Sequence, residues 1–99
     1  MDDATRSALL NLLTAYFGDA STEEGVRGLV FVTRTNPDSH RDYTAALEAG
    51  LAAARQGDPE LVTGLRRNFT PFLRDAAEAE QLLAEILDAY RAAYAAATG

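Results

Sequence analysis

The segment from residue 36 to residue 57, NPDSHRDYTAALEAGLAAARQG, decides the fold class of this chain. Pro37 lacks a backbone N–H and disfavours helical geometry at Asn36, so an earlier helix cannot continue through it. Ser39 can cap a new helix, because its hydroxyl can accept a hydrogen bond from a backbone N–H. The apolar and small residues that follow share one stripe at steps of three and four: Tyr43, Ala46, Leu47, Gly50, Leu51 and Ala54. This period predicts an amphipathic helix that ends at Gly57.

Two more helices are predicted downstream. Asp58-Pro59-Glu60 places a cap, a proline and an acid in the order typical of a helix start, and the helix should bury Leu61, Val62 and Leu65. Asn68-Phe69-Thr70-Pro71 interrupts the pattern again, and either Thr70 or Asp75 can cap the last and longest helix. That helix should bury Leu82, Leu83, Ile86, Leu87, Tyr90 and Tyr94. The tail, residues 95–99, is expected to fray.

Two helices are predicted upstream of Pro37. The first runs from about Ala4 to Phe17, with Gly18 as its stop. Its apolar positions follow the helical period: Leu9, Leu10, Leu12, Leu13, Tyr16 and Phe17. Ser21 and Glu24 then have the spacing of a capping box, which starts the second helix. Residues 29–33 are a β-branched run that also suits a short strand, but the helical spacing before them favours helix.

Together these segments predict an all-α protein of about five helices. Short connections favour a compact antiparallel or orthogonal bundle-like array, and the length favours a single domain over residues 1–99. Hydrophobic residues make up 47% of the chain and charged residues 24%, which is the balance of a globular protein.

Charge and composition limit the functions that this chain can be expected to have. The net charge is −6 and all nine basic residues are arginine, so nucleic acid is not expected as a ligand. A basic protein partner suits this charge, although the same charge also simply keeps a small protein in solution. No long apolar segment is present and the start is acidic, so we expect a cytoplasmic protein with no membrane contact. The absence of cysteine excludes disulfides and thiolate chemistry.

The sequence offers no catalytic machinery. His40 is the only histidine, and at the start of a predicted helix it is expected to be a surface residue. No phosphate loop, dinucleotide fingerprint or metal motif is present, so we expect neither an enzyme nor a cofactor or metal site. Residues 19–23 resemble the opening of a calcium loop, but Glu24 and Val30 stand where its glycine and closing glutamate belong. A helix start explains these residues.

Two acidic groups are the candidate partner-binding residues. On a helical wheel Glu78, Gln81, Glu85 and Asp88 share one stripe of the last helix, and Arg74 lies one turn earlier. This stripe is either a docking surface for a basic partner or a solvated face with an Arg74–Glu78 pair. The second group lies near the start of the second helix and comprises Asp19, Glu23 and Glu24. Tyr16 and Tyr90 suit binding surfaces, but they lie on apolar stripes and are expected in the core.

The order of short motifs resembles a known family. Tyr16-Phe17-Gly18-Asp19, Glu23-Glu24, Tyr43-Thr44-Ala45-Ala46-Leu47, Asp58-Pro59-Glu60-Leu61 and Asp75 before a long final helix follow one another along the chain. This layout is similar to small bacterial immunity proteins of contact-dependent growth inhibition systems, over residues from about Leu9 to Tyr90. The last helix departs from the family pattern, because Gln81-Leu82-Leu83 stands where a tryptophan beside an apolar residue is expected.

The resemblance implies a cytosolic protein that binds the toxic C-terminal domain of an effector, often a nuclease, and blocks its active site or substrate groove. Contacting residues in such proteins follow the toxin, so the resemblance assigns none of them here. The alternative function is a small acidic helical adaptor, or a scaffold module that self-associates, for example as a homodimer. A concentration-dependent dimer would favour the alternative, and a neighbouring toxin gene would favour the immunity protein.

Overall fold

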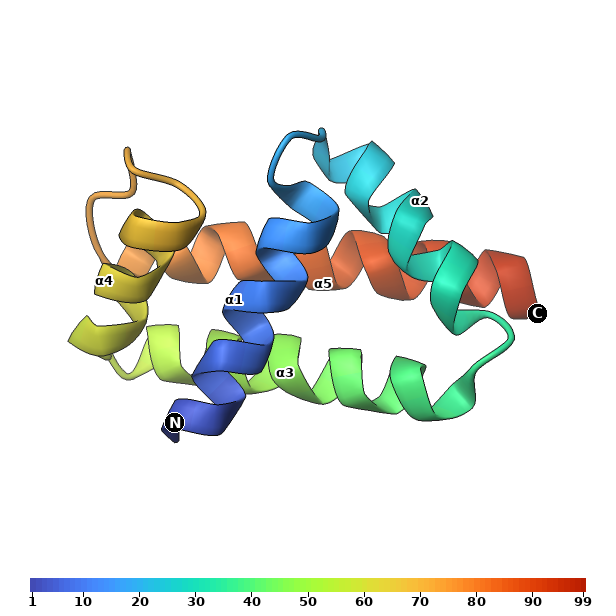
Figure 1. Ribbon diagram of the computed structural model, residues 1–99, viewed down its shortest axis with the longest axis horizontal. Helices are drawn as coiled ribbons and strands as arrows, with labels where there is room; N and C mark the ends of the chain where they lie inside the picture. The colour runs from blue at the N-terminus through green and yellow to red at the C-terminus, as the bar shows by residue number, and fades with distance from the viewer.

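Five α-helices and no strand make up the fold (Figure 1). The computed structural model describes all 99 residues. In chain order the helices are α1 (Asp3–Phe17), α2 (Thr22–Thr33), α3 (Pro37–Arg55), α4 (Pro59–Asn68) and α5 (Ala76–Thr98). The all-α prediction and the choice of helix for residues 29–33 are both confirmed. None of the five helices has the length and apolar composition that a membrane crossing requires.

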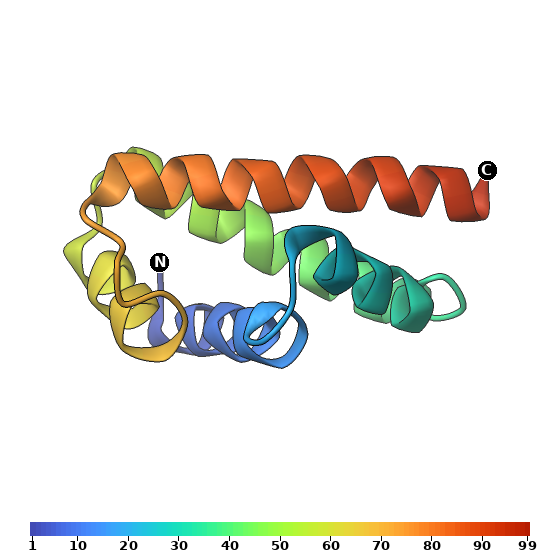
Figure 2. The same cartoon turned by 90° about the horizontal axis from the view of Figure 1, so that it is seen from above.

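The two longest helices, α3 and α5, run antiparallel along the molecule, and α1 crosses them at a steep angle (Figure 1). Figure 2 shows α5 along one side and α1 and α4 on the opposite side. α2 packs against the C-terminal half of α5, and the segment between α4 and α5 turns at the other end of the molecule. The molecule measures 37 × 25 × 18 Å along its principal axes.

The core is one cluster to which all five helices contribute. α1, α3 and α5 meet at Gly50, where an added Cβ would lie 2.5 Å from Leu9 Cδ2 and 3.3 Å from Leu83 Cδ1. α1 and α2 approach closely at Gly25, where an added Cβ would lie 2.2 Å from the Phe17 ring. Small residues at these two crossings therefore set how closely the helices pack.

The helix caps follow the sequence with one correction, at Ser39. Asp58 and Asp75 cap α4 and α5 with their side chains, which leaves Thr70 outside the last helix. Ser39 does not cap α3: the helix begins at Pro37, and the Asn36 side chain accepts a hydrogen bond from the Ser39 N–H. A proline at the first helical position has no N–H to satisfy, which explains the earlier start.

The capping box at α2 forms in part. Ser21 Oγ accepts from the Glu24 N–H, as the spacing predicts, at 3.2 Å. In a complete capping box the Glu24 carboxylate would accept a second hydrogen bond from the Ser21 backbone N–H. Here the Ser21 hydroxyl donates to that carboxylate instead. These contacts engage Ser21, which lies in the segment with calcium-like spacing, and Glu24, which follows that segment, in starting a helix.

Residues 95–98, in the tail that is expected to fray, belong to α5. α5 continues to Thr98, whose hydroxyl donates a 2.8 Å hydrogen bond to the Tyr94 carbonyl. Three consecutive alanines, residues 95–97, extend the helix although they pack against nothing, because alanine has the strongest helix propensity.

Candidate protein-binding site

The segment between α4 and α5 is fixed by hydrogen bonds and presents one aromatic side chain to solvent. Arg66, near the end of α4, donates from Nε to the Leu73 carbonyl at 2.6 Å and from Nη2 to the Arg74 carbonyl. Leu73 is buried in the core, whereas its neighbour Phe72 is 89% exposed. Phe72 is therefore a large apolar side chain held outside the core on a pinned segment.

Phe72 borders a shallow hollow of about 270 Å³ between this segment and α5. We call it the Phe72 hollow, and its lining residues are Thr70, Phe72, Leu73, Glu78, Gln81, Leu82 and Glu85. Leu82 in its lining is half-buried, and Gln81 and Glu85, which α5 also contributes, are exposed. An aromatic ring beside a half-buried leucine and polar α5 side chains is the usual make-up of a protein-binding patch.

The four acidic residues of α5 differ in whether their carboxylates already pair with an arginine. Glu78 accepts hydrogen bonds from the backbone N–H of Arg74 at 2.6 Å and from its Nε at 2.9 Å. These bonds lower the pKa of Glu78 and secure the first turn of the helix. Glu80 pairs with Arg55 across the α3–α5 contact at 3.7 Å. Glu85 and Asp88 are exposed and form no ion pair, so they supply the free negative charge of the predicted stripe.

The second predicted group lies at the start of α2. Glu23 pairs with Arg27 at 3.4 Å, and Glu24 is engaged by Ser21. Asp19 is exposed in the turn between α1 and α2. Neither Asp19 nor Glu24 borders a hollow, so the structure does not bring this group and the α5 stripe into one site.

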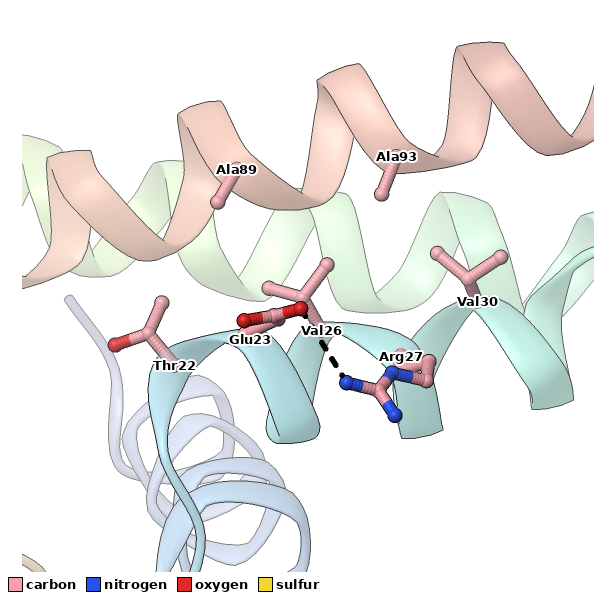
Figure 3. Close-up of a pocket in the computed structure, with 7 residues that line it drawn as sticks. All are labelled: Thr22, Glu23, Val26, Arg27, Val30, Ala89 and Ala93. Atoms are coloured by element: carbon pink, nitrogen blue, oxygen red, sulfur yellow. Dashed lines mark hydrogen bonds and ion pairs between the residues drawn. The ribbon is translucent and has the colours of Figure 1, made fainter.

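A second concave surface, which the sequence analysis did not identify, lies between α2 and α5. We call it the α2/α5 groove; its volume is about 630 Å³, and it is lined by Thr22, Glu23, Val26, Arg27, Val30, Ala89 and Ala93. Figure 3 shows the two valines of α2 pointing toward the two alanines of α5, with the Glu23–Arg27 pair at the rim. The groove wall is therefore mainly apolar.

His40 corrects the expectation of a surface histidine. It is half-buried, and its ring stacks on Tyr94 with centroids 3.6 Å apart. Its Nδ1 lies 2.7 Å from the Tyr90 hydroxyl, which donates to Thr33 Oγ1 at 2.8 Å. The Thr33 hydroxyl donates in turn to the Leu29 carbonyl at 2.8 Å. Since both hydroxyl protons are committed, His40 Nδ1 is the donor to Tyr90, and the residue ties α2, α3 and α5 together.

The two tyrosines singled out by the sequence belong to the interior. Tyr90 is completely buried, and Tyr16 is half-buried against the core. The Tyr43 side chain and burial together raise the pKa of Tyr16 to about 12. The ring centroids of the two tyrosines lie 6.0 Å apart. Burial also raises the pKa of Tyr90. Neither phenol is available as a surface anchor.

Phe72 is the site residue that sequence reasoning missed. A helical wheel relates only residues of the same helix, and Phe72 lies between Pro71 and Leu73 in a segment without helical periodicity. The available signal was a large aromatic residue in a proline-containing interruption just before the acidic stripe. Burial of Leu73 rather than Phe72 depends on tertiary packing and could not be read from the sequence.

No three histidine, aspartate or glutamate side chains lie together as a metal site would require. Comparison with protein-family models, with curated proteins and with solved structures finds no match for this chain.

Proposed function

We propose that this chain is a cytoplasmic immunity protein that binds and neutralises the toxic C-terminal domain of a contact-dependent growth inhibition effector. One observation carries the proposal: Phe72, 89% exposed on a pinned segment, stands beside Leu82 and the unpaired carboxylate of Glu85. The motif order described above supports the family, and the net charge of −6 supports a basic partner.

A nuclease toxin suits this surface for a physical reason. Such an enzyme must bind phosphates, so its substrate groove carries clustered positive charge. An acidic protein is drawn to that groove, and an aromatic side chain at the contact supplies apolar burial that charge alone does not. Occupation of the groove excludes the nucleic acid substrate. The chain therefore needs no catalytic group of its own to neutralise the toxin.

Co-expression tests the proposal. The toxin domain encoded beside this gene should kill cells when it is expressed alone and should be harmless when this chain is expressed with it. The two proteins should also elute together at a 1:1 ratio in size exclusion. Absence of a toxin domain in the neighbouring gene, or equal killing with and without this chain, would refute the function.

A second candidate function has one observation in its favour. Phe31 on α2 is 69% exposed, and exposed apolar side chains can support self-association. The Arg34 guanidinium lies 5.5 Å from the centre of the Phe31 ring and partly occupies it. An adaptor or scaffold built on Phe31 should dimerise with rising concentration in sedimentation velocity, and Phe31→Ser should abolish the dimer. A monomer throughout would exclude this function.

A further inference from the structure

The charged residues in and beside the Phe72 hollow leave one negative charge unbalanced. Glu78 and Glu85 line the hollow, and no cation does. Arg74 pairs with Glu78, and Arg66 donates to backbone carbonyls of the segment between α4 and α5. Asp75, which caps α5, is a third carboxylate against these two cations. Glu85 is exposed and unpaired, and it is therefore free to bind a cation of the partner.

The Phe72 ring supplies a second surface for a cation. It is 89% exposed, and no arginine of this chain lies over it. The other exposed phenylalanine, Phe31, is already faced by Arg34, whose guanidinium carbon lies 5.5 Å from the ring centre. A guanidinium is planar and more weakly hydrated than an ammonium, so it stacks better on an aromatic face. The free ring of Phe72 therefore favours an arginine over a lysine.

The other side chains of the hollow suit an arginine as well. Leu82 is half-buried and offers apolar surface to the methylene groups of an arginine. The side chains of Thr70 and Gln81 form no hydrogen bond within the protein, so their oxygens can accept from guanidinium N–H groups. Gln81 and Glu85 are one helical turn apart on α5, which places both on the same face of the helix.

Two other occupants fit this hollow less well. An apolar side chain alone would cover Gln81 and Glu85 without bonding to them, which costs free energy. A second copy of this chain would bring another net charge of −6 toward the unpaired Glu85.

We infer that the Phe72 hollow receives one arginine side chain of the partner, with its guanidinium on the Phe72 ring beside Glu85 and its methylene groups on Leu82. The arginine belongs to the toxin domain, and in that respect the inference rests on the proposed function. Because Glu85 is exposed, its ion pair would remain in contact with water and add little affinity, so the contact with Phe72 provides most of the binding.

Capped single amino acids test the inference on the full chain in the absence of the toxin. The probe is N-acetyl-arginine methylamide, and the matched probes are the corresponding derivatives of lysine and of norleucine, which has no charge. Chemical shifts of the ¹⁵N-labelled protein, including the side-chain amide of Gln81, report where each probe binds. One side chain of this size is expected to bind with millimolar affinity.

The arginine probe should shift the amides of Phe72, Gln81 and Leu82 and bind at least about three-fold more tightly than either matched probe. Phe72→Leu keeps an apolar side chain without an aromatic face and should weaken arginine binding about three-fold or more. Glu85→Gln should weaken it about two-fold at low salt and less at high salt. Asp88→Asn is the control, because this exposed, unpaired carboxylate lies outside the hollow, and it should leave binding unchanged. All three variants change exposed positions, so the fold should be preserved.

Three outcomes would overturn the inference: equal affinities of the arginine and lysine probes, the absence of saturable shifts at the hollow, or arginine binding that Phe72→Leu does not weaken. Shifts of the same amides with rising protein concentration and no probe would instead show a second copy in the hollow, which would also overturn it. The result is separable from the proposed function. Toxin neutralisation without a preference for arginine at the hollow would sink only this inference, and arginine binding there without protection from the toxin would sink only the immunity function.

Discussion

The Tyr90 hydroxyl on α5 donates a 2.8 Å hydrogen bond to Thr33 Oγ1 on α2, and both side chains are completely buried. His40 on α3 donates to the same phenol, so three helices share one polar junction. A buried polar group is costly when unpaired and specifies one packing when paired. The junction therefore fixes how α2, which carries one wall of the groove, lies against α5.

Removal of the Tyr90 hydroxyl should destabilise the protein. Tyr90→Phe keeps the ring and loses the bonds to Thr33 and His40, at an expected cost of about 1–2 kcal/mol in the free energy of unfolding. Thr33→Val should also be destabilising, because it leaves the buried phenol without its acceptor. The double variant should cost less than the sum of the two single ones in urea unfolding. Strict additivity would show that the two residues do not interact.

High pH should destabilise the folded state through the tyrosines. The pKa of Tyr16 in the fold is about 12, above the value near 10 of an unfolded chain, and burial raises the pKa of Tyr90 in the same direction. The unfolded chain therefore releases these protons first, so stability is complete below about pH 10 and falls as pH rises toward 12. Tyr16→Phe should make this fall less steep in unfolding curves measured across that range. An unchanged slope would contradict the assignment.

The helical fold was open to prediction because its signals are local. Pro37, Asp58 and Asp75 act on the neighbouring backbone, and an apolar stripe can be counted along a helix. The stack of His40 on Tyr94 and the exposure of Phe72 were not predictable, because each depends on residues brought together from distant parts of the chain. The acidic stripe was predicted as a surface feature, but only the structure shows that Arg74 pairs with Glu78, which leaves Glu85 and Asp88 as its free charges.

Gly25 should tolerate no side chain. An added Cβ would lie within 2.4 Å of two atoms of the Phe17 ring, so Gly25→Ala must push α1 and α2 apart. The expected cost is about 1–3 kcal/mol, although alanine is the better helix former. Gly64→Ala is the control, because its Cβ would lie 3.0 Å from the flexible end of Leu10 and at ordinary contact distance, 3.8 Å, from Arg6 Cδ. Equal thermal stability of the two variants would show that the α1–α2 contact can relax.

Leu47 and Leu83 are completely buried on α3 and α5, and truncation of either should be strongly destabilising. Leu47→Ala or Leu83→Ala should lower the free energy of unfolding by about 2–5 kcal/mol, through lost burial and the cavity left behind. Leu82→Ala, at the half-buried position beside Leu83, should cost clearly less. A cost below about 0.5 kcal/mol for Leu83→Ala, the range of surface changes, would mean that the faces of α5 are reversed.

The Phe72 hollow and the free carboxylates of α5 should affect different rate constants of toxin binding. Phe72→Ala should leave unfolding unchanged and raise the dissociation rate, because an exposed anchor contributes contact rather than folding energy. Glu85→Arg combined with Asp88→Arg should mainly slow association, and less so at high salt. Glu78 is left intact, since its reversal would also disturb the Arg74 contact and the start of α5. Asp42→Arg, at an exposed and unpaired carboxylate on α3, is the control for net charge.

The most direct test is the affinity of the toxin domain for Phe72→Ala beside the parent chain, measured by surface plasmon resonance at low and high salt. We expect a loss of about ten-fold or more at both salt concentrations, with an unchanged melting temperature and with Asp42→Arg close to the parent. Binding of Phe72→Ala equal to that of the parent at both salt concentrations would contradict the claim that this hollow is where the partner docks.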